Sequence, residues 1–209
     1  MIQVKICGIT NVADALAAVD AGANLLGFNF YEKSPRCIGE AEAAKIRPRL
    51  PKKVAAVGIF VNAPTAEVAA LCKSLKLDAA QLHGDESPET VAKLAQKLPV
   101  WKAFRVEPDF RLETLGEYPG ATAFLFDAAH TGQYGGTGRT TDWDVARRAA
   151  LGHRIILAGG LNLENVAAAV RIVRPYAVDV ASGVESKPGK KDHGLLREFI
   201  QEVRRGERK

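Results

Sequence analysis

The stretch IQVKICGIT, residues 2–10, decides the fold class because the same kind of unit recurs along the whole chain. Its apolar run Val4–Cys7 has the length and composition of a buried strand, and it ends at a thiol beside Gly8. Thr10 and Asn11 follow at once, and both side chains can cap a helix start. A buried strand that leads directly into a helix is typical of a parallel α/β fold.

Runs rich in Val, Ile, Leu and Phe recur eight times, with Ala-rich segments of helical spacing between them. The eight runs are Val4–Cys7, Leu25–Phe30, Val54–Val61, Ala79–Leu82, Val100–Phe104, Ala123–Asp127, Arg154–Ala158 and Ala177–Ala181. Further helix starts are indicated at Ser87, Asp142 and Asn162. A doubly wound open sheet would typically stop at about five or six strands, so the pattern favours a (β/α)8 TIM barrel. Because no linker-like segment divides the chain, we expect residues 1–209 to form a single barrel domain.

The composition is that of a globular protein and excludes several classes. No apolar run approaches the roughly 18 residues that a membrane helix requires, and the first residues lack the apolar core of a signal peptide. The three cysteines are odd in number and widely spaced, which fits reduced thiols better than disulfides or a zinc site. We therefore expect a cytoplasmic protein with no membrane partner.

The formal net charge of +5 fits an anionic ligand. Several of the positive charges lie in the tail Arg204–Lys209, which has none of the aromatic residues that stack on nucleic-acid bases. We expect a solvated helix end there and no nucleic-acid partner. The oligomeric state stays open, because an exposed apolar helix face has the same sequence pattern as a core face.

Glycines and polar residues follow the predicted strands, at the end of a barrel where active sites are built. Gly159-Gly160 follows the seventh run and Ser182-Gly183 the eighth, and glycines there let backbone N–H groups approach a phosphate. These four residues predict a phosphate site, the alternative being ordinary turns. The segment TGQYGGTG, residues 131–138, is too long for a turn and lacks a Walker-type ending, so we expect a mobile loop that closes on substrate.

Cys7 has two interpretations. At a strand end beside a glycine it can be a nucleophile or a proton-abstracting base, and a free thiol is also commonly a small buried hydrophobe. Lys5 shares its strand face at about 6.6 Å, so a protonated Lys5 could help lower the thiol pKa. Asp179, in the eighth run, would neighbour the first run once the barrel closes, and we predict a buried Lys5–Asp179 pair.

Two further side chains stand at strand ends. Asp127 follows four apolar residues and is either a structural cap or a catalytic acid in apolar surroundings. His83 shares a strand face with Gln81, so the two could line a polar pocket, and we expect His83 to contact substrate. The remaining histidines show no metal-ligand spacing, so a metal site is not expected.

These motifs, in this order, resemble the phosphoribosylanthranilate isomerases, a family of tryptophan-pathway barrel enzymes, from Lys5 to about Asp192. The matching stretches are Lys5–Thr10, Gly27–Phe30 with Ser34–Arg36, Gln81–Gly84, Phe126-Asp127 with Gly135–Gly138, Leu157–Leu161 and Val178–Glu185. The resemblance implies a TIM barrel and an Amadori rearrangement of N-(5-phosphoribosyl)anthranilate to an open-chain carboxyphenylamino deoxyribulose phosphate. It implies no metal, nucleotide or organic cofactor.

The resemblance also implies roles for named residues. Asp127 would protonate the ribose ring oxygen, and Cys7 as thiolate would remove the C2′ proton of the resulting Schiff base. Arg36 would contact the anthranilate carboxylate, because a guanidinium matches a planar carboxylate. The last two loops would hold the phosphate through Gly159, Gly160, Ser182 and Gly183. The chain departs from the family's pattern at loop edges and helix starts, namely Thr141, Leu163 and Ala181.

Two alternatives remain. The histidine-pathway isomerase performs the same rearrangement on another phosphoribosyl substrate, but it resembles a barrel with carboxylates in both catalytic positions, which Cys7 disfavours. A catalytically silent phosphate-binding barrel would bind ligand without turnover, yet this chain retains both candidate catalytic groups. Of the other thiols, we expect Cys37 to be dispensable and Cys72 to be a packing residue.

Overall fold

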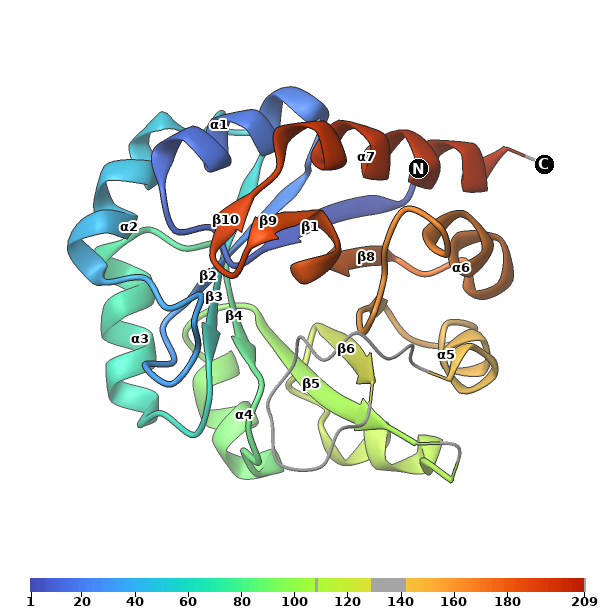
Figure 1. Cartoon of the computed structure of the whole chain (residues 1–209). Helices are drawn as coiled ribbons and strands as arrows, with labels where there is room; N and C mark the ends of the chain where they lie inside the picture. The colour runs from blue at the N-terminus through green and yellow to red at the C-terminus, as the bar shows by residue number, and fades with distance from the viewer. Residues whose placement is uncertain (108, 129–141, 209) are drawn as a thin grey trace.

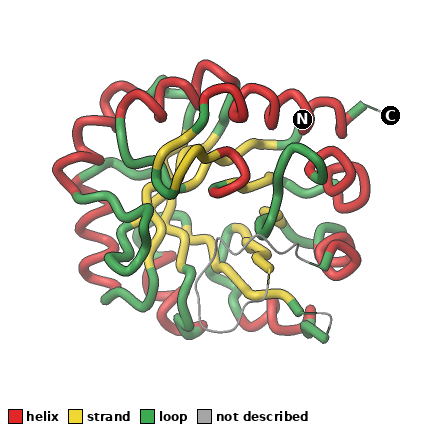
Figure 2. Tube along the Cα trace, viewed as in Figure 1, coloured by secondary structure: helices red, strands yellow, loops and turns green. Residues whose placement is uncertain are grey.

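The computed structural model describes residues 1–107, 109–128 and 142–208 (Figure 1). Eight parallel strands form a closed barrel in the order of the sequence, which confirms the predicted TIM barrel. They are β1 (Gln3–Cys7), β2 (Leu25–Asn29), β3 (Ala55–Phe60), β4 (Ala79–Leu82), β5 (Val100–Val106), β6 (Ala123–Ala128), β7 (Ile155–Leu157) and β8 (Ala177–Val180). Figure 2 shows the strands gathered inside and the helices around them.

The helices of the described residues alternate with these strands. The α-helices are α1 (Val12–Ala21), α2 (Glu40–Ile46), α3 (Thr65–Ser74), α4 (Pro88–Ala95), α5 (Trp143–Ala149), α6 (Val166–Val173) and α7 (His193–Glu207). The 3₁₀ helices are η1 (Arg47–Arg49), η2 (Leu112–Glu117), which connects β5 to β6, and η3 (Ser182–Val184). In the described part of the chain, no helix is long and apolar enough to cross a membrane.

Three of the predicted helix starts are confirmed, because the side chains of Asn11, Ser87 and Asp142 each accept hydrogen bonds from the first turn of the helix that follows. The start predicted at Asn162 is wrong. Its side chain accepts from the N–H groups of Glu164 and Asn165, which closes a turn, and α6 begins only at Val166.

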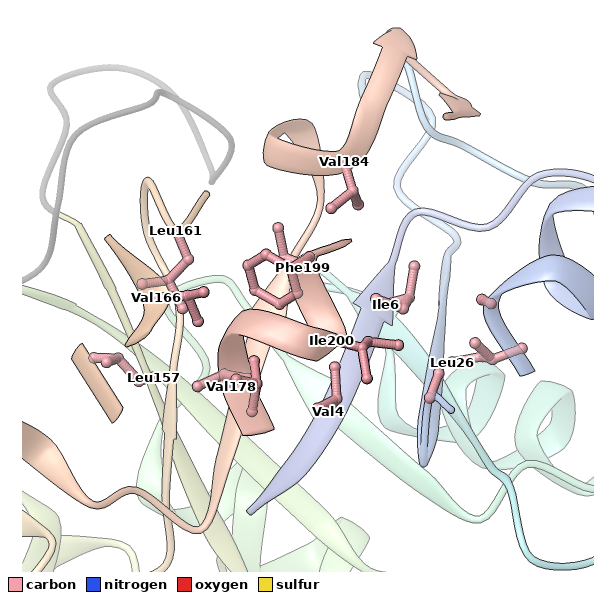
Figure 3. Packing of buried hydrophobic residues seen from close by; sticks show 14 of the residues in the cluster. Val4, Ile6, Leu26, Leu157, Leu161, Val166, Val178, Val184, Phe199 and Ile200 are labelled. Atoms are coloured by element: carbon pink, nitrogen blue, oxygen red, sulfur yellow. The ribbon is translucent and has the colours of Figure 1, made fainter. Parts of the chain in front are cut away.

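Side chains of successive strand residues point to opposite faces of the barrel wall, so the buried apolar residues form one layer outside the barrel and one inside it. Val4 and Ile6 point outward and pack with Phe199 of α7 between barrel and helices (Figure 3). A second cluster lies inside the barrel, and its larger members are Leu25, Val57, Trp101, Leu125 and Ile156. Because Lys5 alternates with Val4 and Ile6, it faces the barrel interior, where it is fully buried.

A short antiparallel hairpin follows β8 and was not foreseen from the sequence. It consists of β9 (Glu185–Lys187) and β10 (Lys190–Lys191), joined through Gly189 at φ +78°. The Thr10 hydroxyl donates to the Gly189 carbonyl at 2.6 Å, so the hairpin is attached to the loop that follows β1 (Figure 1). The hairpin is therefore held against the rim of the barrel beside β1.

Candidate active site

A pocket opens at the carboxyl ends of the strands, as the fold predicts. It is lined by residues at or just after the carboxyl ends of β1, β2, β3, β4, β6, β7 and β8. Seven of the eight residues selected from the sequence line it: Cys7, Arg36, His83, Asp127, Gly159, Gly160 and Ser182. Residues more than 150 positions apart in the chain are thus brought to one cavity by closure of the barrel.

Gly183 is the one selected residue that does not line the pocket. A Cβ atom built on it would lie 2.1 Å from the Leu161 carbonyl oxygen, so the loops after β7 and β8 touch only because residue 183 is glycine. Gly159 and Gly160, both on the wall, have positive φ angles of 82° and 64°. Among the described residues, nothing accepts a hydrogen bond from their backbone N–H groups, which leaves these donors for a ligand.

The predicted pair of Lys5 and Asp179 is confirmed. The two residues are register partners where β1 and β8 close the barrel, and Lys5 Nζ lies 2.9 Å from Asp179 Oδ2. Burial by itself would lower the pKa of Lys5, but the charges of Asp179 and Cys7 and the hydrogen bonds to both together outweigh burial and raise it. Lys5 is therefore a buried cation directly below the thiol.

Cys7 ends β1 and is partly exposed to the pocket. Burial raises the pKa of its thiol, the charge of Lys5 lowers it, and Asp179 raises it again. The predicted lowering by Lys5 is present as a contribution, but the net direction is upward because desolvation is the largest effect. The thiol is thus mostly protonated at neutral pH, and the Lys5 cation is in place to stabilise the thiolate once it forms.

Asp127 ends the apolar part of β6 on the other side of the pocket and is 6% exposed. His83 Nε2 lies 3.3 Å from Asp127 Oδ2, and Gln81 Nε2 lies 2.9 Å from His83 Nδ1. The Gln81 amide can donate to Nδ1, which places the imidazole proton on Nε2, the atom that faces the Asp127 carboxylate. The prediction that Gln81 and His83 share a polar pocket is confirmed, and Gln81 Oε1 is buried with no hydrogen-bond partner in the described residues.

Arg36 reaches the pocket from the loop after β2. Its aliphatic stem crosses Gly8, where a Cβ would lie 2.6 Å from Arg36 Cδ and where φ is +74°. The guanidinium donates from Nε and Nη2 to the two carboxylate oxygens of Glu185, at 2.9 and 2.7 Å. Lys191 Nζ donates to Glu185 Oε1 at 2.9 Å. Sequence reasoning missed Glu185 and Lys191 as parts of the site, although Glu185 closes the last matching motif.

The other residues considered from the sequence are placed as follows. Cys37 and Cys72 are free thiols away from the pocket wall, and Cys72 is buried in α3, where burial raises its pKa to about 12. His193 pairs with Asp14 at 2.9 Å. The predicted closing loop 131–138, His130 and Thr141 lie outside the described residues. Within the described ranges, no group of three or more His, Cys, Asp or Glu side chains is arranged to hold a metal ion.

Comparison with known proteins gives one consistent result. The family model described as N-(5′-phosphoribosyl)anthranilate (PRA) isomerase matches residues 4–202. An N-(5′-phosphoribosyl)anthranilate isomerase of Pelobacter propionicus is 51% identical over 201 residues, covering 96% of this chain and 95% of the relative. The phosphoribosyl anthranilate isomerase of Thermotoga maritima has a crystal structure that matches with a TM-score of 0.91 at 41% identity, covering 98% and 99%. A phosphoribosyl anthranilate isomerase bound to reduced 1-(o-carboxyphenylamino)-1-deoxyribulose 5-phosphate matches with a TM-score of 0.87 at 40% identity, with the same coverage.

Proposed function

The chain belongs to the family of N-(5′-phosphoribosyl)anthranilate isomerases, and from this membership we infer the reaction and the roles of its pocket residues. The protein is an isomerase of tryptophan biosynthesis. It converts N-(5-phosphoribosyl)anthranilate to 1-(2-carboxyphenylamino)-1-deoxyribulose 5-phosphate by an Amadori rearrangement. Its ligand is accordingly a small phosphoribosyl compound.

The roles of acid and base rest on one observation, namely that Asp127 and Cys7 line one pocket from β6 and β1. We propose that the Asp127 carboxyl gives its proton to the ribose ring oxygen as the C1′–O bond breaks, while the nitrogen lone pair forms the C1′=N bond of a protonated Schiff base. The Cys7 thiolate then takes the C2′ proton. The electron pair of that C–H bond forms the C1′–C2′ double bond, and the C=N pair moves to nitrogen. The resulting enolamine tautomerises to the ketone.

The neighbours of each group support this division of roles. Lys5 lies beside Cys7 with its charge retained by Asp179, so it stabilises the thiolate that the base step requires. The Nε2 atom of His83 lies 3.3 Å from Asp127 Oδ2, so the imidazole is placed to stabilise the carboxylate that remains after the acid has given up its proton. We also propose that the exposed part of the His83 ring contacts substrate.

The two ends of the substrate would be held by different walls. We propose that Gly159, Gly160 and Ser182 bind the phosphate through backbone N–H groups, with Gly183 allowing the two loops to meet. Arg36 Nη1, which has no acceptor in the described part of the chain, would donate to the anthranilate carboxylate. No step in this scheme calls on a cofactor.

We further propose that the chain works as a single catalytic domain, residues 1–209, in the cytoplasm. One closed barrel accounts for the eight strands, which supports the single domain. Cys7, Cys37 and Cys72 are all free, and Cys7 must stay reduced to act as a base, which supports a reducing compartment.

The test is the fluorescence decay of freshly generated phosphoribosylanthranilate on addition of the purified protein. We expect rapid decay with the wild type, and loss of this acceleration in Cys7→Ser, whose hydroxyl is far too weakly acidic to form the required base. A folded wild type that does not accelerate the decay would reject the function. Turnover by Cys7→Ser at the wild-type rate would reject only the assignment of the base.

A further inference from the structure

One buried carboxylate joins three segments of the mouth. Glu185, at the start of β9, accepts two hydrogen bonds from Arg36 of the loop after β2 and one from Lys191 of β10. The Gly189 N–H donates to the same carboxylate at 3.3 Å. The side chain of Glu185 is only 4% exposed and that of Lys191 is fully buried. This cluster is part of the pocket wall through Arg36.

The contacts of Arg36 with Glu185 and Gly8 hold its guanidinium in a single orientation. A bidentate pair holds the guanidinium and the carboxylate in one plane, and here it occupies Nε and Nη2. The stem is confined by its close passage over Gly8. The outer edge of the guanidinium, with both N–H groups of Nη1 and the second N–H of Nη2, remains for a further acceptor in the described structure. Glu185 therefore decides which part of Arg36 a ligand can meet.

The charges of the cluster do not cancel. Two cations, Arg36 and Lys191, share one carboxylate, so the cluster holds one positive charge in excess. Burial lowers the pKa of Lys191 and Glu185 opposes this, while the nearby Arg36 adds to the lowering. Burial would raise the pKa of Glu185, but Arg36 and Lys191 outweigh it and hold this pKa below its ordinary value. A buried cluster with excess positive charge favours an anionic ligand.

We propose that Glu185 is a positioning residue that, together with Lys191, fixes Arg36 so that the site selects substrates with a carboxylate on the aromatic ring. The proposal rests on the proposed function and adds to it the residue that sets substrate specificity. Arg36 without Glu185 would keep its charge but lose the orientation of Nη1. The effect should therefore fall on binding of the ring carboxylate and not on the acid and base steps.

A purely structural role is the competing explanation, since Glu185 also ties the hairpin to the rest of the mouth. The chain offers a matched control in Glu86, which is 3% exposed, pairs with Lys102 at 3.0 Å and accepts from two backbone N–H groups. Glu86 anchors the loop after β4 and lies outside the wall of the pocket that holds Cys7. Glu86→Gln thus breaks a comparable buried pair without touching Arg36.

The experiment measures calorimetric dissociation constants for two probes in the full chain. One probe is reduced 1-(o-carboxyphenylamino)-1-deoxyribulose 5-phosphate, and the other is the same compound without the ring carboxylate. A hydrogen bond to a charged group predicts that wild type prefers the first probe by roughly 10- to 100-fold. We expect Glu185→Gln to lose most of this preference by weakening the first probe alone, with KM rising and kcat nearly unchanged. Glu86→Gln should keep the preference.

Other results overturn the proposal. Equal weakening of both probes in Glu185→Gln, or an unchanged preference, would show that Glu185 only supports the fold. If Glu185→Gln does not fold, Glu185→Asp provides the same comparison, because it keeps the charge and withdraws the carboxylate by one methylene. An Asp variant with the wild-type preference would likewise reject the positioning role. A wild type that neither turns over phosphoribosylanthranilate nor prefers the first probe would reject the proposed function itself, and this outcome is distinct from the others.

Discussion

The two sides of the barrel mouth are built from different chemistry. On the thiol side, formed by β1, β2, β8 and the hairpin, the side chains around Cys7 are fully charged and paired, as in Lys5–Asp179 and Arg36–Glu185. On the acid side, formed by β4 and β6, the Gln81 amide contacts the His83 imidazole, and this imidazole lies 3.3 Å from the Asp127 carboxyl. A thiolate is stabilised by fixed cations, whereas an acid that must hold and then release a proton is better served by a hydrogen-bond donor. The difference between the sides therefore agrees with the two proton transfers that we propose.

The largest expected effect comes from removing the reacting group on the acid side. Asp127→Asn keeps the shape of the side chain but cannot donate the proton, so we expect kcat to fall by about 100-fold or more, as for loss of a general acid. Single-turnover kinetics measure this directly. Because the thiol side is intact in this variant, the thiol should titrate as in wild type. Near-normal turnover would show that another group protonates the ring oxygen.

The charged pair below the thiol should be the strongest contributor to stability among the site residues. Asp179→Asn leaves Lys5 buried without its partner, and we expect the free energy of unfolding to fall by about 3–5 kcal/mol. Urea denaturation measures this quantity. Asp127→Asn is the comparison variant on the other side of the pocket, because it removes a buried carboxylate that lies 3.3 Å from an imidazole, and we expect it to cost less. An Asp179→Asn variant as stable as wild type would contradict the comparison.

A third effect concerns the loops that join the two sides. In Gly183→Ala the new Cβ would meet the Leu161 carbonyl oxygen at 2.1 Å, so the loops after β7 and β8 must separate. We expect a loss of about 1–3 kcal/mol in stability, as for overpacking, and a higher KM because the phosphate donors move apart. Gly152→Ala is the control, since a Cβ there meets no atom within 4 Å. Equal stability and equal KM in Gly183→Ala and Gly152→Ala would argue against the contact between the two loops.

The next effect in size is the pH dependence of kcat/KM, which we expect the thiol side to set. Burial raises the pKa of Cys7 above its ordinary value, so at neutral pH the thiolate is a minority whose fraction grows about tenfold per pH unit. We expect kcat/KM to rise with pH through the neutral range. Because the charge of Lys5 is the largest contribution that lowers the thiol pKa, this limb should move to higher pH in Lys5→Met. A rate that is already level at neutral pH would contradict the assignment of Cys7 as the base.

The smallest effect is expected at Cys37. It follows Arg36 in the chain but does not line the pocket, and burial raises the pKa of its thiol. Cys37→Ala should therefore retain turnover and KM. A large loss of activity in a folded Cys37→Ala variant would show that the thiol side contains a second reactive sulfur.

Much of the site could be predicted because barrels place the ends of successive strands at one rim. That rule selected Cys7, His83, Asp127 and the glycines after β7 and β8, and all but Gly183 line the pocket. The pair Lys5–Asp179 was also predictable, since closure of eight strands makes the first and last of them neighbours.

The hairpin and its carboxylate were not predictable in the same way. Glu185 lies 149 residues from Arg36, beyond the last strand, where no periodic rule states what it will meet. The start of α6 was misplaced for a related reason, because the side chain of Asn162 closes a turn as readily as it caps a helix.

The amino-acid sequence by itself determined the strands, most of the helix starts and the residues at the rim, because these follow from short-range alternation, capping and turn chemistry. Only the tertiary structure decided which side chains meet across the mouth: Arg36 with Glu185, His83 with Asp127, and Gly183 with Leu161. It also decided the direction in which the thiol pKa moves. Desolvation and Coulomb interaction depend on distances between segments remote in the chain, and those distances exist only once the barrel has closed.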